Sequence, residues 1–447
     1  MVAAPPSLLR VKITVIGCGY LGATHAACMA ELGHEVLGVE IDEAKRASLT
    51  AGEVPFYEPH LADLLAKHVA TGRLRFTDSF AEAGAFADLH FVCVGTPQLP
   101  SSMGADTSYV EAAMRSLAPH VERPAYVVGK STVPVGTAAR MAELLASLAP
   151  VGAAAELVWN PEFLREGFAV KDTLEPDRLV LGVASEGAEQ ALREFYAPQA
   201  ETGTPFVVTD YATAELVKVS ANAFLATKIS FINAVGEVCD AAGADIVALA
   251  DAIGHDARIG RRFLNAGVGF GGGCLPKDIR AFVHRAGELG VEDAMSFLRQ
   301  VDDINQRQRL RATQIVKGML GGSMTDARIG VWGAAFKPDS DDVRDSPALS
   351  IAGALHLQGA HVSVYDPKAT ETARARFPTL TYAGSAIEAA EGADMLLHLT
   401  EWPEFRAIAP EDVGAVMARR LLLDGRNLLD LTAWRAAGFE ARGLGTR

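Results

Sequence analysis

The sequence predicts an α/β protein with two Rossmann-like, doubly wound parallel-sheet domains joined by a long central helix and a helical dimerisation segment. Short apolar strands alternate with helical patterns up to residue 209, and the alternation resumes after residue 322. Between them lies a long apolar stretch without proline. We therefore expect an N-terminal domain over residues 1–209, a central helical segment over 210–322 and a C-terminal domain over 323–447.

Composition narrows the class of protein. The chain has 447 residues and a net charge of −14, which argues against a general nucleic-acid-binding role. Its five cysteines show neither a CxxC spacing nor a metal-site pattern, so we expect a reducing cytoplasm and no metal. Residues 1–9 have no basic region and no long apolar run, so we expect neither a signal peptide nor a membrane span.

The first domain opens with a dinucleotide-binding pattern. An apolar strand over 11–16 is followed by the glycines Gly17, Gly19 and Gly22, by a helical stretch up to Leu32 and by a second strand that ends at Glu40. The first glycine makes the tight turn, the second admits a pyrophosphate, and the third lets the helix pack on the strand. A carboxylate at Glu40 accepts hydrogen bonds from ribose hydroxyls and repels a 2′-phosphate, which favours NAD over NADP.

Further strands follow, and α/β proteins bind ligands at the carboxyl ends of such strands. One of them leads into the segment 160–167, where Glu162 and Glu166 lie four residues apart. These acids are either catalytic or part of a solvated turn, and the spacing alone does not decide. The expected strands cover residues 89–94, 125–128, 158–159, 179–183 and 206–208.

In the central segment Asp210 is a candidate N-cap for a helix from Tyr211 to about Ala242, roughly 45 Å long at 1.5 Å per residue. Lys218 and Asn222 are four residues apart and share one face of this helix. A snorkelling surface lysine is the alternative for Lys218. Further helices are expected near 245–253, 276–289 and 291–320.

A glycine-rich stretch over 267–273 precedes Cys274 and a helix that starts near Pro276. Glycines let a ligand approach the main chain, and a cysteine just before a helix, beside Lys277, is placed to act as a nucleophile. The alternative is a buried, inert cysteine in a tight loop. After residue 327 the strand-and-helix alternation returns without a full G-x-G-x-x-G, which indicates a different ligand there.

In combination these motifs resemble the UDP-glucose/GDP-mannose dehydrogenase family, over roughly residues 11–432. The RIG…FL run before the glycine loop favours the branch that oxidises UDP-glucose. The motifs are GCGYLG at 17–22, VGTP at 94–97, KSTVPVGT at 130–137, NPEFLREG at 160–167, ELVKVSANAFLATKISFIN at 215–233, RIGRRFLNAGVGFGGGCLPKD at 258–278, GAAFKPDSDDVRDSP at 333–347, YDP at 365–367, TEW at 400–402 and DGR at 424–426.

The resemblance implies NAD-dependent oxidation of a sugar 6-hydroxyl to a carboxylate, with two NAD per sugar. It implies that Cys274 attacks the aldehyde to give a thiohemiacetal, which is oxidised to a thioester and hydrolysed. Lys218 and Asn222 would stabilise the oxyanion, Asp278 would hold Lys218 and a water, Glu162 would be the acid/base, and Thr132 would position water. A homodimer is implied, with Arg258 reaching the neighbour's site.

Binding residues are implied in the same way. For the cofactor they are Gly17, Gly19, Tyr20, Leu21, Gly22, Glu40, Lys45, Thr96, Thr132, Glu166, Lys277 and Arg344. For the nucleotide sugar they are Glu162, Phe163, Leu164, Lys218, Asn222, Arg258, Asn265, Gly269, Phe270, Gly271, Phe336, Lys337 and Arg426.

The chain departs from the family pattern at three positions: Glu40 replaces an aspartate, Gly273 a serine, and His60 a glycine. Three alternatives stay open at this point. They are oxidation of GDP-mannose or a UDP-N-acetylhexosamine, a two-electron hydroxyacid-type dehydrogenase with an inert cysteine, and a catalytically silent NAD-binding regulator.

Overall fold

A computed structural model describes residues 10–446 of the chain. The expectation for residues 1–9 lies outside the described part. The chain divides into two compact units, one up to Ala221 and one from Asn222 onward, and the boundary falls inside the long helix α10, Tyr211–Ala242. Helix α10 has the predicted bounds, and Asp210 caps it by accepting a hydrogen bond from the Thr213 N–H at 2.7 Å.

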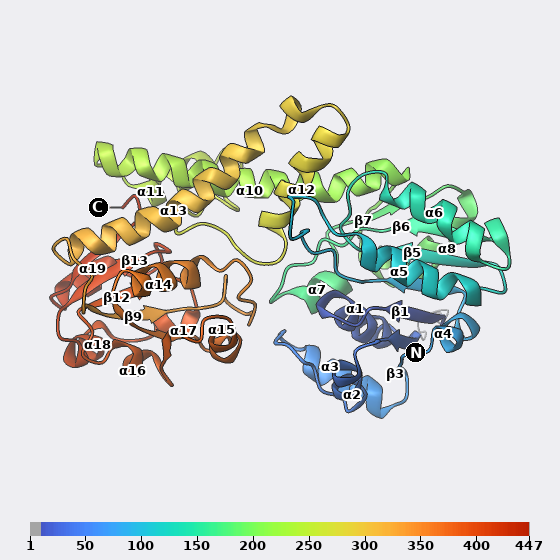
Figure 1. Ribbon diagram of the computed structural model, residues 1–447, viewed down its shortest axis with the longest axis horizontal. Helices are drawn as coiled ribbons and strands as arrows, with labels where there is room; N and C mark the ends of the chain where they lie inside the picture. Colours follow the sequence, from blue (N-terminus) through green and yellow to red (C-terminus); the bar gives the residue numbers. More distant parts are fainter. Residues whose placement is uncertain (1–9, 447) are drawn as a thin grey trace, which may run out of the picture. The chain divides into compact units, whose positions relative to one another are not determined.

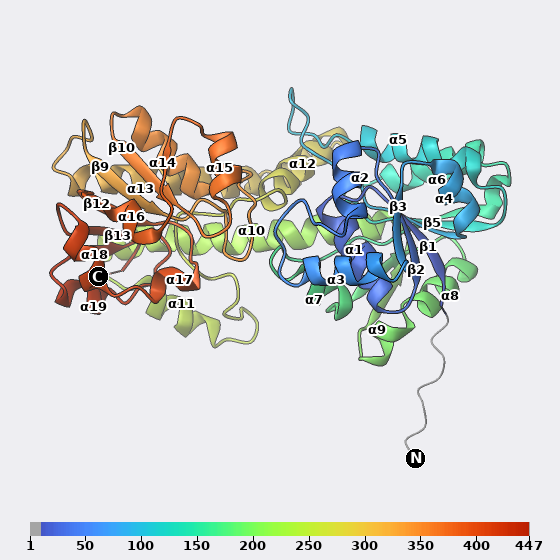
Figure 2. The ribbon, with the colours of Figure 1, turned by 90° about the horizontal axis from the view of Figure 1, so that it is seen from below.

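The first unit is built on an eight-stranded sheet in the order β3-β2-β1-β4-β5-β6-β7-β8. Figure 2 labels β1, β2, β3 and β5 of this sheet. Its first six strands have the order 3-2-1-4-5-6 of a dinucleotide-binding fold. Every pairing is parallel except β6 with β7, which is antiparallel and was not predicted. The strands are β1 Lys12–Ile16, β2 Glu35–Val39, β3 Leu74–Thr77, β4 Leu89–Val92, β5 Ala125–Gly129, β6 Ala155–Trp159, β7 Leu179–Gly182 and β8 Phe206–Thr209.

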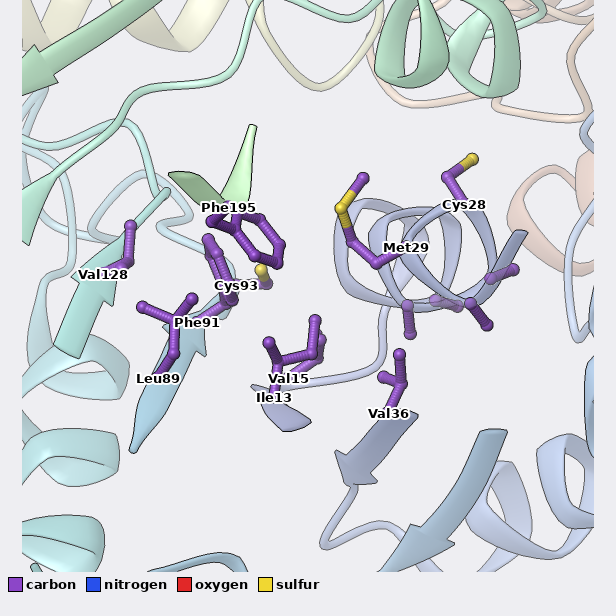
Figure 3. Packing of buried hydrophobic residues seen from close by; sticks show 14 of the residues in the cluster. Ile13, Val15, Cys28, Met29, Val36, Leu89, Phe91, Cys93, Val128 and Phe195 are labelled. Atoms are coloured by element: carbon purple, nitrogen blue, oxygen red, sulfur yellow. The ribbon is translucent and has the colours of Figure 1, made fainter. Parts of the chain in front are cut away.

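Helices cover both faces of this sheet because its strands are apolar on both sides. Ile13 and Val15 of β1 pack under α1 with Phe91 and Phe195 (Figure 3). Ile16 belongs to the cluster on the opposite face. The helices are α1 Tyr20–Glu31, α2 Glu43–Thr50, α3 Leu61–Ala70, α4 Phe80–Phe86, α5 Ser108–Leu117, α6 Thr137–Leu148, α7 Ala169–Leu174, α8 Glu186–Phe195 and α9 Ala197–Glu201.

The second unit has a six-stranded, all-parallel sheet in the order β11-β10-β9-β12-β13-β14, which repeats the order of the first six strands of the other sheet. The matching order supports the two α/β halves as a remote duplication. Helix α14 covers one face (Figure 1), and on the other face Trp332 of β9 packs with Phe405 and Trp434. The strands are β9 Arg328–Trp332, β10 His361–Tyr365, β11 Thr381–Tyr382, β12 Met395–His398, β13 Leu421–Asp424 and β14 Glu440–Gly443.

The helix expected over 291–320 begins later, at Phe297, because a 3₁₀ turn at Glu292–Met295 precedes it. Among residues 10–446 no helix is both long enough and apolar enough to cross a membrane. The helices of this unit, after α10, are α11 Ile246–Gly254, α12 Leu275–Glu288, α13 Phe297–Met319, α14 Pro347–Leu357, α15 Thr370–Arg376, α16 Ala386–Ala390, α17 Pro403–Arg406, α18 Pro410–Val416 and α19 Leu431–Ala436.

Candidate active site

The turn between β1 and α1 has the geometry that a dinucleotide requires. Gly17 adopts φ +84°, and a Cβ on Gly22 would lie 1.9 Å from the Gly17 carbonyl oxygen, so helix and turn can pack only without side chains there. A Cβ on Gly19 would meet no atom within 4 Å, so space is open over the second glycine at the helix N-terminus. These residues fit a pyrophosphate on the main-chain N–H groups.

Glu40 lies at the end of β2, as expected, and is buried. Its Oε2 accepts a hydrogen bond from the Cys18 N–H at 3.1 Å and its Oε1 accepts one from the Asp42 N–H at 2.9 Å. Glu40, which is one methylene longer than the aspartate of the family pattern, therefore contacts the glycine turn. Lys45 is exposed in the first turn of α2, where its N–H donates to the Asp42 carboxylate at 3.0 Å.

The loops after β4 and β5 are joined by side chains. Thr96 donates to the Thr132 carbonyl oxygen at 2.7 Å, and Ser131 donates to the Val94 carbonyl oxygen at 2.6 Å. Both predicted residues, Thr96 and Thr132, thus belong to one edge of the sheet. Lys130 beside them is buried, and burial lowers its pKa. Its ammonium donates to Asn160 Oδ1 at 2.9 Å, which fixes the start of the loop after β6.

That loop carries Glu162, whose Oε2 accepts from the Leu164 N–H at 2.7 Å and whose Oε1 lies 3.3 Å from Lys218 Nζ. Lys218 is 5% exposed, and its ammonium also lies over the Phe163 ring. The surface-lysine alternative is therefore wrong. A lysine held between a carboxylate and an aromatic face is placed to stabilise a nearby negative charge.

Glu58, which the sequence analysis missed, connects two predicted regions. Its carboxylate accepts hydrogen bonds from the Tyr20 hydroxyl and from the N–H groups of Gly167 and Ala169. Burial raises the pKa of Glu58. Glu166 is buried beside this network. The available signal was an acid between two turns, in the segment 55–61, which reads PFYEPHL.

The second unit contains Cys274, the predicted nucleophile. Cys274 occupies the N-cap position of α12 and is exposed, whereas Cys18, Cys28, Cys93 and Cys239 are buried. The alternative of a buried cysteine is therefore wrong. One turn into α12, Asp278 is buried and accepts from Asn222 Nδ2 at 2.6 Å and from Lys277 Nζ at 2.5 Å.

The glycine loop over 267–273 packs against the segment that carries Arg426. The Val268 N–H donates to the Gly425 carbonyl oxygen at 3.0 Å, and Arg426 Nη1 donates to the Gly269 carbonyl oxygen at 3.1 Å. Arg426 Nη2 donates to the Phe336 carbonyl oxygen at 3.2 Å. The structure thus brings together Asn222, Gly269, Phe270, Gly271, Cys274, Lys277, Asp278, Phe336 and Arg426 within this unit.

Three predicted residues lie at the margin of this arrangement. Asn265 is exposed and accepts from Arg261 Nη1 at 2.7 Å. Lys337 follows Phe336, and its ammonium lies 5.5 Å from that ring centroid. The Arg258 side chain is 89% exposed and pairs with Asp256 at 2.6 Å.

The structure shows the local surroundings of two of the family departures, Gly273 and His60. A Cβ on Gly273 would lie 2.3 Å from the guanidinium carbon of Arg344, so the exposed end of that flexible side chain would have to move aside for a serine. His60 has φ +67°, a left-handed conformation that glycine adopts without strain. The glycine that the family usually has at this position would relieve the backbone strain that His60 introduces.

Comparisons with known proteins show the family of the chain. Family models of the UDP-glucose/GDP-mannose dehydrogenase family match the NAD binding domain at residues 11–200, the central domain at 212–307 and the UDP binding domain at 330–431. The chain belongs to this family. It is an NAD-binding nucleotide-sugar dehydrogenase.

Individual relatives extend over the whole chain. It is 41% identical over 440 residues to the UDP-glucose 6-dehydrogenase of Rhizobium meliloti, with 97% of this chain and 99% of that protein covered. The solved UDP-glucose dehydrogenase of Pyrobaculum islandicum is 36% identical, with full coverage of both chains and a TM-score of 0.91. A UDP-D-ManNAc dehydrogenase of Pyrococcus horikoshii is 27% identical, covers 97% of this chain and 99% of its own, and has a TM-score of 0.84.

Proposed function

We propose that the protein oxidises UDP-glucose to UDP-glucuronate with two NAD, through a thioester on Cys274. The observation that carries the proposal is Cys274 itself, exposed at the N-cap of α12 and followed one turn later by the buried Asp278–Asn222 pair. The 41% and 36% identical UDP-glucose dehydrogenases support UDP-glucose as the sugar. When bound, NAD accepts one hydride in each of the two oxidations.

The chain's residues supply the remaining chemistry. In the first oxidation the 6-hydroxyl loses a proton to a base and becomes an aldehyde. The Cys274 thiolate then forms a carbon–sulfur bond with the aldehyde carbon, and the resulting thiohemiacetal is oxidised to a thioester. Water breaks the carbon–sulfur bond, which releases the carboxylate and restores the thiol.

We assign Lys218 and Asn222 to the developing oxyanion, because they lie one turn apart on the same side of α10. Asn222 is oriented by its hydrogen bond to Asp278, and Lys218 by Glu162. Glu162 is the proposed acid/base, with Thr132 as a positioning group for water. Both are supported by their place at the carboxyl ends of β6 and β5.

For binding, we assign the cofactor to the turn over 17–22 with Glu40, Lys45, Thr96, Glu166, Lys277 and Arg344. We assign the nucleotide sugar to the loop over 265–271 with Phe163, Leu164, Phe336, Lys337 and Arg426. The proposed segments remain 1–209, 210–322 and 323–447.

We further propose that the protein is a homodimer. Phe224, Phe231 and Val238 on α10 are 66%, 54% and 64% exposed. They follow one another at intervals of seven residues, which places them in a single stripe along the helix, as in helices that pair. An apolar stripe of this kind on a soluble domain indicates a protein partner, and in this family arrangement Arg258 would act on the neighbour's substrate.

A substrate panel tests the assignment. Purified protein is assayed for NADH formation with UDP-glucose, GDP-mannose, UDP-N-acetylglucosamine and UDP-N-acetylmannosamine. We expect the highest kcat/KM with UDP-glucose. A preference for an N-acetylated sugar, the chemistry named for the Pyrococcus horikoshii relative, would overturn the substrate and leave the reaction class intact.

A further inference from the structure

Two side chains of α13 hold the main chain of Phe270, in the middle of the glycine loop. Asn305 Oδ1 accepts from the Phe270 N–H at 2.8 Å, and Asn305 Nδ2 donates to the Phe270 carbonyl oxygen at 3.0 Å. Arg309, one helical turn later, donates from Nη2 to the same oxygen at 3.1 Å. Asn305 is completely buried and Arg309 is 7% exposed, so water does not compete for these bonds.

The neighbouring glycines are what allow this contact. Gly269 has φ +96°, and a Cβ there would lie 2.4 Å from Asn305 Oδ1. A Cβ on Gly271 would lie 2.3 Å from the Asp345 carbonyl oxygen. Any larger residue at either position would push the loop away from its supports, which explains why glycine flanks Phe270 on both sides.

Arg309 also fixes the segment on the other side of the loop. Its Nη1 donates to Asp345 Oδ1 at 2.7 Å, and its Nη2 donates to the Asp345 carbonyl oxygen at 3.2 Å. The Gly272 N–H in turn donates to the Arg344 carbonyl oxygen at 2.8 Å. The main chain of the loop is therefore held between α13 and the segment 344–345, by the side chains of Asn305 and Arg309 on one side and by the Gly272–Arg344 main-chain hydrogen bond on the other.

We propose that Asn305 and Arg309 are positioning residues that hold the glycine loop in its substrate-binding shape and fix the chain that enters Cys274. This inference rests on the proposed function, in which the loop contacts the sugar. A loop so rich in glycine has many conformations, and ordering it only when substrate binds would weaken binding. Helix α13 supplies that order beforehand. Neither residue needs to touch the sugar, because both act through the Phe270 main chain.

The test compares Asn305→Ala and Arg309→Lys with Thr313→Val as the matched control. Thr313 is buried on the same helix, one turn after Arg309, and its hydroxyl donates only to the Arg309 carbonyl oxygen at 3.1 Å. Hydrogen exchange of the peptide over 267–273 reports on the loop. Alkylation by iodoacetamide reports on Cys274, since the other four cysteines are buried. Kinetics with UDP-glucose and the Kd of NAD report on function.

For Asn305→Ala we expect loop exchange and the KM for UDP-glucose each to rise at least about tenfold, as the loss of two buried hydrogen bonds implies. The rate at which iodoacetamide alkylates Cys274 should also differ from the wild-type rate, because the same loop leads into that residue. The Kd of NAD should stay within about twofold of wild type, because the cofactor turn makes none of these bonds. The Thr313→Val protein should match wild type in all four measurements. Arg309→Lys should shift exchange and KM in the same direction but less, because lysine lacks the second donor arm.

Loop exchange or a KM no different from the Thr313→Val control would overturn the proposal, as would faster exchange with an unchanged KM. If circular dichroism shows that Asn305→Ala does not fold, Arg309→Lys decides by the same criteria. If wild-type protein does not oxidise UDP-glucose, the proposed function fails. The exchange and alkylation measurements still test the contact between α13 and the loop in that case.

Discussion

Glu215 gives a prediction whose size follows from the structure. It lies on α10, is 2% exposed, and accepts hydrogen bonds from the Gly136 N–H at 2.7 Å and the Ala138 N–H at 2.6 Å. The carboxyl group thereby caps α6 and fixes the loop that carries Thr132. Burial raises the pKa of Glu215 to about 7, although the two N–H bonds act in the opposite direction.

The sign of the pH effect follows from linkage. The unfolded carboxyl has a pKa of 4.5, so between that pH and about 7 the folded protein keeps a proton that the unfolded chain has lost. The stabilisation is complete below pH 4.5 and is lost as the pH rises through 7. At about 1.4 kcal/mol per unit of pKa, the loss approaches about 3 kcal/mol.

Glu215→Gln removes this titration and keeps the size of the side chain. The glutamine side chain has only one acceptor oxygen, so it can accept from only one of the two N–H groups. The variant should therefore be less stable than wild type by about 1 kcal/mol near pH 5. Between pH 5 and about pH 8.5, the free energy of unfolding of the variant should rise relative to that of wild type by about 2–3 kcal/mol.

Urea unfolding followed by tryptophan fluorescence, at both pH values, measures this shift. Glu143→Gln, an exposed acid on α6, is the matched control and should show the wild-type pH dependence. A pH dependence of Glu215→Gln that runs parallel to wild type would refute the reasoning, because it would mean that Glu215 keeps an ordinary pKa when folded.

Three other predictions concern the proposed site. Glu40→Ala should narrow the preference for NAD over NADP, and a ratio of kcat/KM values unchanged from wild type would contradict the role of that carboxylate. Cys274→Ser should bind UDP-glucose and NAD normally by calorimetry and should lose at least about a thousandfold in turnover, since a hydroxyl is a far weaker nucleophile than a thiolate. Near wild-type turnover would end the covalent mechanism. Arg258→Ala should raise the KM for UDP-glucose with little change in Tm, because its side chain is 89% exposed. A fully active monomer in sedimentation would disprove the proposed dimer.

Local patterns in the sequence predicted much of the fold. Helix α10 begins and ends at the predicted residues, because Asp210 provides a cap and no proline interrupts the apolar run that follows. The turn over 17–22 was predicted for the same kind of reason: the roles of its three glycines depend only on neighbouring residues. The position of Cys274 just before α12 likewise follows from the local run Gly273–Pro276, in which glycine precedes the cysteine and proline opens the helix.

Features that depend on distant residues were not predictable in this way. The antiparallel pairing of β6 with β7 depends on how the chain returns to the sheet, and no residue pattern encodes that return. Asn305 meets Phe270 across 35 residues, and Glu58 meets Gly167 across 109. The spacing of Asn305 and Arg309 on one face of a helix was visible, but what that face contacts was not.

The central claim is a four-electron oxidation, and the yield of NADH tests it most directly. A limiting, known amount of UDP-glucose is converted to completion with excess NAD, and NADH is measured by its absorbance while the sugar product is identified by mass. The account predicts two NADH per UDP-glucose and a UDP-linked carboxylate. One NADH with an aldehyde product, or no NADH, would contradict it.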